Sequence, residues 1–187
     1  IRLLVPLVAG GLTDIMARLV GNKLAETWGQ GVIVDNRPGA SGIIASEIVA
    51  KAPADGYTLI AVAMAHAVNA SIQSKLPYDT LKDFTAVAYL GDVPQVLIVR
   101  PQLKITTVRE LISAAKARPG QINYGSGGVG GSSHMAMELF RIGAGIELQH
   151  IPYKGAYQAL VEFLGGHLDL NFATLSSVVR YINSGQI

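Results

Sequence analysis

The chain is 187 residues long, 50% of them hydrophobic and 15% charged, and its formal net charge is +2. This composition supplies enough apolar residues for a sizeable core and argues against long disordered segments. The balance of basic and acidic residues argues against a nucleic-acid partner, because such proteins usually carry a clustered basic face. The absence of cysteine excludes disulfides, cysteine-zinc sites and thiol catalysis.

The longest stretches without a charged residue are 56–74 and 119–137, and both are interrupted by polar residues or glycines. Neither is the continuous apolar run of about 20 residues that crosses a bilayer, so we expect no transmembrane helix. The chain opens in a strand pattern and not in a signal peptide, which leaves secretion open.

The first third of the chain alternates short apolar runs with helical patterns. The spacing predicts strands at 1–5, 32–35 and 57–63 and helices at 14–28 and 42–51. This β-α-β-α-β order predicts a parallel sheet with right-handed crossovers. Residues 64–84 break the alternation and are predicted to form a polar segment with turns.

Two strands without an intervening helix, at 85–90 and 95–100, lead into a second run of alternating elements. Thr107 and Glu110 match a capping box that opens a helix. The remaining pattern predicts strands at 122–125, 148–151 and 168–173 and helices at 132–142, 156–164 and 176–183. We therefore predict two α/β lobes, 1–99 and 100–187, each a mainly parallel sheet flanked by helices. The return of the chain to the first sheet is missing from this pattern, so we expect a C-terminal truncation.

Two glycine-rich loops, at 6–14 and 125–133, each lie between a predicted strand and a predicted helix. Both place backbone N–H groups at a helix N-terminus, an arrangement that binds anions. Each loop alone is equally well explained as a tight turn with ordinary capping. The two together favour an anion site.

Other chemistries fit the loops less well. Gly125, Gly127 and Gly130 form a G-x-G-x-x-G pattern with Glu147 downstream, but the preceding strand is short and Glu147 precedes its strand instead of ending it. The lysine of a P-loop is absent. His134 and Glu138, four residues apart, are better explained as a helical surface pair than as metal ligands.

No set of residues supplies a nucleophile, a base and an orienting group. Asp14 is an acid in a first helical turn, where capping alone explains it. Ser132 and Ser133 are expected to cap their helix and to donate hydrogen bonds to a carboxylate. The sequence thus predicts binding without turnover, with no cofactor and no metal.

Eight short motifs, taken in order, resemble the Bug family of periplasmic solute-binding proteins, the receptors of tripartite tricarboxylate transporters. They are AGGLTD at 9–14, NRPGA at 36–40, DGYTL at 55–59, LPYD at 76–79, KARPGQ at 116–121, SSH at 132–134, PYKG at 152–155 and LGGHLD at 164–169. The resemblance implies a two-lobed, type II periplasmic-binding-protein-like fold and no enzymatic activity. It implies a periplasmic monomer that captures a small organic acid between its lobes and delivers it to membrane transporter subunits. The alternative is a Rossmann-like nucleotide-binding enzyme or regulator.

The resemblance also assigns candidate ligand-binding residues. On the first lobe these are Ala9, Gly10, Gly11, Thr13 and Asp14, with Ala63, Met64, Ala65 and His66 after the third strand. On the second lobe these are Ser126, Gly127, Gly128, Ser132 and Ser133, with Tyr153, Lys154, Gly155, Asn171, Ala173 and Thr174 as the far wall. Many members have hydroxyl residues where Ala63 and Met64 stand and an aspartate in place of Ala173. These departures favour an aromatic or aliphatic acid over an amino acid.

Overall fold

The computed structural model describes residues 1–187 and divides the chain into two units, Ile1–Leu90 and Gly91–Ile187. The boundary predicted from the sequence pattern lies between residues 99 and 100. The structure assigns the strand that begins at Gln95 to the second unit, because that strand pairs with β7 (Leu170–Thr174).

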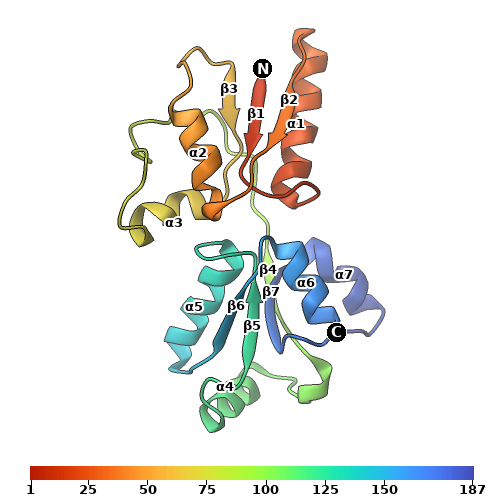
Figure 1. Cartoon of the computed structure of the whole chain (residues 1–187). Coiled ribbons are helices and arrows are strands. Elements are labelled where there is room, and N and C mark those ends of the chain that lie inside the picture. Colours follow the sequence, from red (N-terminus) through yellow and green to blue (C-terminus); the bar gives the residue numbers. More distant parts are fainter. The chain divides into compact units, whose positions relative to one another are not determined.

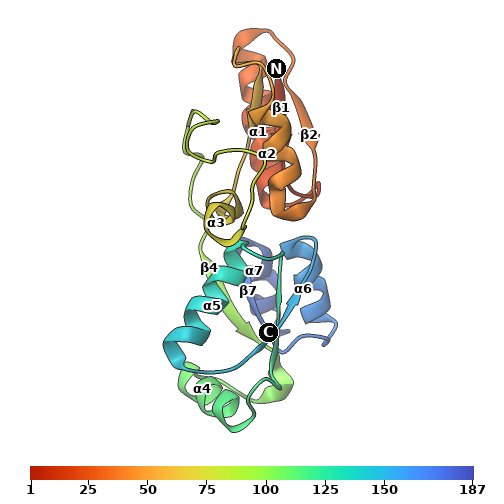
Figure 2. The ribbon, with the colours of Figure 1, turned by 60° about the vertical axis from the view of Figure 1, so that its left-hand side comes forward.

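A three-stranded parallel sheet in the order β2-β1-β3 forms the centre of the first unit (Figure 1). Its strands are β1 (Arg2–Val5), β2 (Ile33–Asn36) and β3 (Thr58–Ile60), and its helices are α1 (Leu12–Trp28), the short 3₁₀ turn η1 (Ala40–Gly42), α2 (Ile43–Ala50) and α3 (Met64–Ile72). Right-handed crossovers in this order place α1 and α2 on opposite faces of the sheet, as Figure 2 shows. The predicted β-α-β-α-β arrangement is confirmed.

Helix α1 packs closely on this sheet because small residues face it. Ala17 is fully buried against Leu3 and Val5 of β1. A Cβ on Gly21 would lie 3.2 Å from a methyl group of Val32, so glycine permits the close approach. The helix ends at Gly29, whose φ of 64° is the left-handed cap that glycine favours.

The second unit has a four-stranded sheet in the order β4-β7-β5-β6. Its strands are β4 (Gln95–Val99), β5 (Asn123–Ser126), β6 (Gln149–Pro152) and β7, and its helices are η2 (Pro101–Leu103), α4 (Val108–Ala117), α5 (Ser132–Ala144), α6 (Ala156–Leu164) and α7 (Leu175–Asn183). Strand β5 runs parallel to β6 and β7, whereas β4 runs antiparallel to β7. The capping box of α4 is present, with Thr107 and Glu110 bonding each other's backbone N–H groups.

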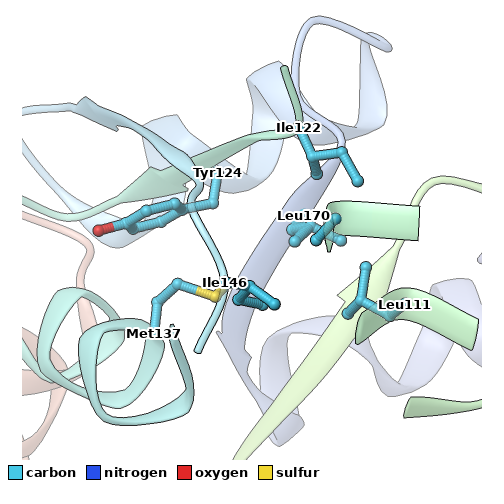
Figure 3. Packing of buried hydrophobic residues seen from close by; sticks show 7 residues of the cluster. Leu111, Ile122, Tyr124, Met137, Ile146 and Leu170 are labelled. Carbon is cyan, nitrogen blue, oxygen red and sulfur yellow. The ribbon is translucent and has the colours of Figure 1, made fainter. Parts of the chain in front are cut away.

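Each face of this second sheet covers its own apolar cluster. Figure 3 shows the larger cluster, which includes Leu111, Ile122, Tyr124, Met137, Ile146 and Leu170. The other cluster includes Ile98, Leu160, Phe163, Leu168, Ala173 and Val178. Alternate residues of β7 join different clusters, as the two-residue repeat of a strand requires.

Two local predictions are wrong. Residues 64–72 form α3, not part of a polar segment with turns; the side-chain amide of Asn69 is buried there and donates to the carbonyl oxygen of Ser41 at 3.0 Å. Residues 85–90 form no strand. Val87 and Tyr89 are 77% and 75% exposed, and no neighbouring strand pairs with this segment.

Candidate functional site

The helices after the two glycine-rich loops begin with the same backbone geometry. Gly10 and Gly130 have φ angles of 83° and 78°, which glycine adopts without steric cost. The next residues, Gly11 and Gly131, are the N-caps of α1 and α5, with φ/ψ of −76°/166° and −68°/162°. Neither N-cap supplies a side-chain hydrogen bond. The uncapped N–H groups and the positive end of the helix dipole make each turn attractive to an anion.

In each loop, the side chain of the third residue of the following helix accepts a hydrogen bond from a backbone N–H group. Asp14, the third residue of α1, accepts the backbone N–H of Gly10 at 2.8 Å. His134, the third residue of α5, accepts the backbone N–H of Gly130 through Nδ1 at 3.2 Å. The two loops therefore share one framework, in which the acceptor is a carboxylate in the first unit and an imidazole in the second.

The carboxylate of Asp14 is buried and fully engaged. Arg18 forms an ion pair with it at 3.0 Å, and Asn36 Nδ2 donates to Oδ1 at 3.0 Å. Asn36 also donates to the carbonyl oxygen of Leu7 at 3.1 Å, which ties the end of β2 to the loop. The hydrogen bond from Arg18 outweighs burial and holds the pKa of Asp14 below its usual value. Such a weak base holds the loop in shape and is poorly suited to accept a proton.

Residues Ala63, Met64 and Ala65 lie at the same edge of the sheet as this loop, because β1 and β3 are parallel and both end there. Ala63 is the N-cap of α3 and has no side-chain cap. Ala63 and Met64 are exposed, Met64 to 50%, and Ala65 is half-buried. The structure thus brings the two groups of candidate residues of the first unit to one edge.

His66 is engaged in packing within the first unit. Its Nδ1 lies 3.0 Å from Ser46 Oγ, so it connects α3 to α2. Its ring stacks on Tyr78 with 5.8 Å between centroids and meets the edge of Phe84 at 4.8 Å. Burial lowers the pKa of His66. Its side chain therefore packs inside the first unit, between α2 and the rings of Tyr78 and Phe84.

The serines of the second loop organise its backbone. Ser126 is fully buried, and its Oγ accepts the N–H of Gly128 at 3.2 Å. Ser133 is also buried, and its Oγ accepts the N–H of Gly127 at 3.1 Å. The expectation that Ser132 and Ser133 cap α5 is wrong, because Gly131 is the N-cap and no side chain caps the helix.

Ser132 has a partner that the sequence did not indicate. Its exposed hydroxyl oxygen accepts a hydrogen bond from Gln95 Nε2 at 2.5 Å. Gln95 opens β4 and stands opposite Thr174 in the antiparallel register. Because β4 runs against its neighbours, its first residue lies at the edge where β5, β6 and β7 end. A reversed strand of this kind has no signature in local sequence, which is why Gln95 was missed.

The loops after β5 and β6 touch. A Cβ on Gly127 would lie 2.7 Å from the backbone nitrogen of Ala156, so only glycine fits. Tyr153 donates its backbone N–H to the carbonyl oxygen of Ser126 at 2.9 Å. Lys154 is exposed and makes no ion pair, and Gly155 is the buried N-cap of α6. Candidate residues 126–133 and 153–155 therefore share one edge of the second unit.

The three candidates on β7 are placed differently from one another. Thr174 is half-buried at the end of the strand. Ala173 is 5% exposed and packs in the apolar cluster with Ile98 and Leu160. Asn171 is 2% exposed, and its Nδ2 has no hydrogen-bond partner. Only Thr174 lies at the edge that carries the loops.

Two histidines stack beneath the second loop. The ring centroids of His134 and His150 are 4.3 Å apart, and the ring of Tyr124 also stacks on His150, with 4.8 Å between centroids. His150 Nε2 lies 2.6 Å from Ser126 Oγ. Burial, reinforced by His134, lowers the pKa of His150 to about 4, and burial also lowers the pKa of His134. Both rings are therefore neutral near pH 7 and bond groups of the loop.

Glu138 and Glu147 both form ion pairs with Arg141. Glu138 accepts a hydrogen bond from the Tyr124 hydroxyl at 2.7 Å and pairs with Arg141 at 2.9 Å, and its charge acts against the lowering of the His134 pKa by burial. Glu147 precedes β6 and pairs with the same arginine at 3.3 Å. No group of three or more histidine or acidic side chains converges as a metal site.

A family model described as "Tripartite tricarboxylate transporter family receptor" matches residues 16–187. The protein BugT of Bordetella pertussis (strain Tohama I) is 39% identical over 189 residues, a match that covers 100% of this chain and 58% of BugT. A relative from Cupriavidus necator is 35% identical over 187 residues, which are 57% of its length. The chain thus spans a little over half the length of these relatives.

Solved structures that are similar to this chain include one with adipate, one with bound malate and one periplasmic binding protein. The structure described as "R. palustris Rpa4515 with adipate" is 38% identical with a TM-score of 0.90, and the match covers 100% of this chain and 62% of that one. MatC from Rhodopseudomonas palustris with bound malate is 30% identical with a TM-score of 0.89, covering 100% and 64%. The periplasmic binding protein BugD is 30% identical with a TM-score of 0.86, covering 100% and 62%. These likenesses confirm the predicted fold class.

Proposed function

The chain belongs to the family of tripartite tricarboxylate transporter receptors that includes the Bug proteins, and from this premise we propose that it captures a small carboxylic acid for a membrane transporter of that class. The family match over residues 16–187 carries the proposal. Members of this family are solute-binding receptors and not enzymes. The adipate and malate bound by two similar proteins support a carboxylate as the ligand class.

The periplasm is the proposed location. Two similar structures, one of them BugD, are described as periplasmic. No helix of this structure combines the length and the apolar character needed to span a bilayer. A periplasmic receptor delivers its ligand to the transporter as a separate protein, which is the role we propose here.

The first turns of α1 and α5 supply the proposed carboxylate contacts. Each offers uncapped backbone N–H groups at the positive end of a helix dipole. On the second unit, the exposed hydroxyl of Ser132 is a further donor, and the unpaired ammonium of Lys154 is a cation at the same edge. An anion receptor built in this way needs few basic residues, which agrees with the net charge of +2.

The remainder of the proposed ligand is apolar. Ala63 and Met64 are exposed at the edge that carries the first loop and offer no hydrogen-bonding side chain. We therefore favour an aliphatic or aromatic acid over an amino acid.

A thermal-shift screen tests the proposal. A ligand at about 100 times its dissociation constant stabilises a protein by about 2.7 kcal/mol. We expect stabilisation by adipate or benzoate, a smaller effect of aspartate, and none by NAD or ATP. Stabilisation by NAD or ATP without any by carboxylic acids would support a nucleotide-binding protein and overturn the proposal.

A pair of lysine variants tests the site within the same screen. Lys154→Gln and Lys116→Gln remove the same charge, but only Lys154 lies at the edge with the glycine loop. We expect Lys154→Gln to weaken adipate binding by up to about fivefold, the upper end of the range for an exposed charge contact, and Lys116→Gln to leave it unchanged. Equal effects of the two variants would contradict the assignment.

A further inference from the structure

Two histidine rings form hydrogen bonds with the second glycine-rich loop, one with a backbone N–H and one with a serine hydroxyl. Nδ1 of His134 accepts the backbone N–H of Gly130, and Nε2 of His150 bonds the buried hydroxyl of Ser126. Ser126 in turn accepts the N–H of Gly128. The stacked rings, 4.3 Å apart, therefore act on both ends of the segment that precedes α5.

Burial is the main effect that disfavours an imidazolium in this stack. From β5, Tyr124 presents its ring to His150, and its hydroxyl is bonded to Glu138. On α5, the charge of Glu138 opposes the effect of burial on both rings, and Glu138 is itself paired with Arg141, which also pairs with Glu147 before β6. The N-terminus of α5 adds a positive dipole beside His134. A second charge on the stacked pair would meet repulsion at short range.

We propose that His134 and His150 are positioning residues that, in their neutral forms, hold residues 126–131 in the conformation that binds the carboxylate. This inference rests on the proposed function of the loop. A backbone N–H needs an acceptor, and the Nδ1 of His134 accepts only while it carries no proton. Protonation places an N–H against the N–H of Gly130, so the ring or the loop must move. The equivalent Asp14 stays an acceptor throughout the range in which histidine titrates.

The amide signal of Gly130 tests the positioning directly, without a ligand. In ¹⁵N-labelled protein titrated from neutral to acid pH, we expect this signal to shift together with the side-chain signals of His134. His134→Gln provides an acceptor without a titrating proton, because its side-chain carbonyl oxygen replaces Nδ1 as the acceptor for the N–H of Gly130. The Gly130 signal of that variant is expected not to titrate. A matched control is His167→Gln, which removes an exposed histidine paired with Glu162 and is expected to leave the shift intact.

Adipate binding tests the consequence. Protonation of His134 removes one hydrogen bond and places a donor against the N–H of Gly130. We therefore expect the wild type to bind adipate about tenfold more weakly in acid than the His134→Gln variant does. Comparison with the variant removes the effect of protonating adipate itself. By linkage, adipate is expected to lower the pKa of His134 by about one unit.

The outcomes separate the two proposals. Identical pH profiles of adipate affinity in wild type and His134→Gln, or a Gly130 signal that titrates in both, overturn the positioning role. If adipate binds neither protein at any pH, the proposed ligand fails, and the Gly130 titration still decides whether His134 controls the loop.

Discussion

Asn36 donates its side-chain amide to Oδ1 of Asp14 at 3.0 Å and so joins the end of β2 to the first turn of α1. The same amide bonds the carbonyl oxygen of Leu7 in the intervening loop. One side chain thus fixes three segments around the proposed anion-binding turn. Asn36 is the last residue of β2, which places it at the edge of the sheet that carries the loop of α1.

Asn36→Ala is expected to destabilise the protein by about 1–3 kcal/mol, because it removes the hydrogen bonds to the buried carboxylate of Asp14 and to the carbonyl oxygen of Leu7. The free energy of unfolding in urea measures the effect. Glu26→Gln is the control, since Glu26 forms an exposed pair with Lys23 that is worth about 0–1 kcal/mol. Equal losses in the two variants would show that Asn36 does not organise the loop.

Gly127→Ala is expected to destabilise the protein by about 1–3 kcal/mol, because the new Cβ would lie 2.7 Å from the backbone of Ala156. We also expect weaker adipate binding, since the loop must shift. Gly143→Ala is the matched control, because Gly143 lies in α5 with nothing within 4 Å of the added atom. Alanine there should stabilise the helix by about 0.5–1 kcal/mol. A neutral Gly127→Ala would contradict the close contact between the loops.

Acid is expected to destabilise the fold through His150. Burial lowers its pKa to about 4, whereas the unfolded chain protonates near the ordinary value of 6.5. The unfolded state therefore binds the proton first, so stability is complete above pH 6.5 and falls as the pH drops towards 4. After allowance for partial exposure, the loss is about 2 kcal/mol. Thermal unfolding across this range should show a flatter profile for His150→Gln, and parallel profiles would refute the assignment.

Tyr124→Phe is expected to cost about 1–2 kcal/mol in unfolding free energy, because it deletes a buried hydroxyl bonded to Glu138. Burial and this hydrogen bond raise the pKa of Tyr124 well above its usual value. Tyr57→Phe, at a 65% exposed position, serves as the comparison and should be neutral. Equal effects of the two substitutions would show that the hydrogen bond from Tyr124 to Glu138 does not stabilise the protein.

Much of the fold was predictable because its signals are local. The strands and helices of the first unit follow from apolar spacing, and the bounds of α6 at 156–164 are those that the spacing predicts. Helix α3 was missed because the burial of Asn69 depends on Ser41, far away in sequence. The segment 85–90 has an apolar composition, but a strand also requires a partner, and none pairs with it.

The candidate site was predictable at the level of loops and less so at the level of side chains. Two glycine loops before helices give a strong local signal, and both helices begin without a side-chain cap. The pairing of His134 with Gly130 depends on the positive φ of that glycine, which spacing alone does not specify. Gln95 was missed because its place beside Ser132 follows from the reversed direction of β4.

The central claim is that the uncapped turn of α1 in the first unit and that of α5 in the second each offer backbone N–H groups to a carboxylate. Backbone amide shifts of ¹⁵N-labelled protein on addition of adipate test it most directly, because the proposed contacts are backbone N–H groups. The account predicts that the largest shifts fall on residues 10–14 and 130–134. Saturable shifts confined to other parts of the chain, or no saturable shift with any small carboxylic acid, would contradict it.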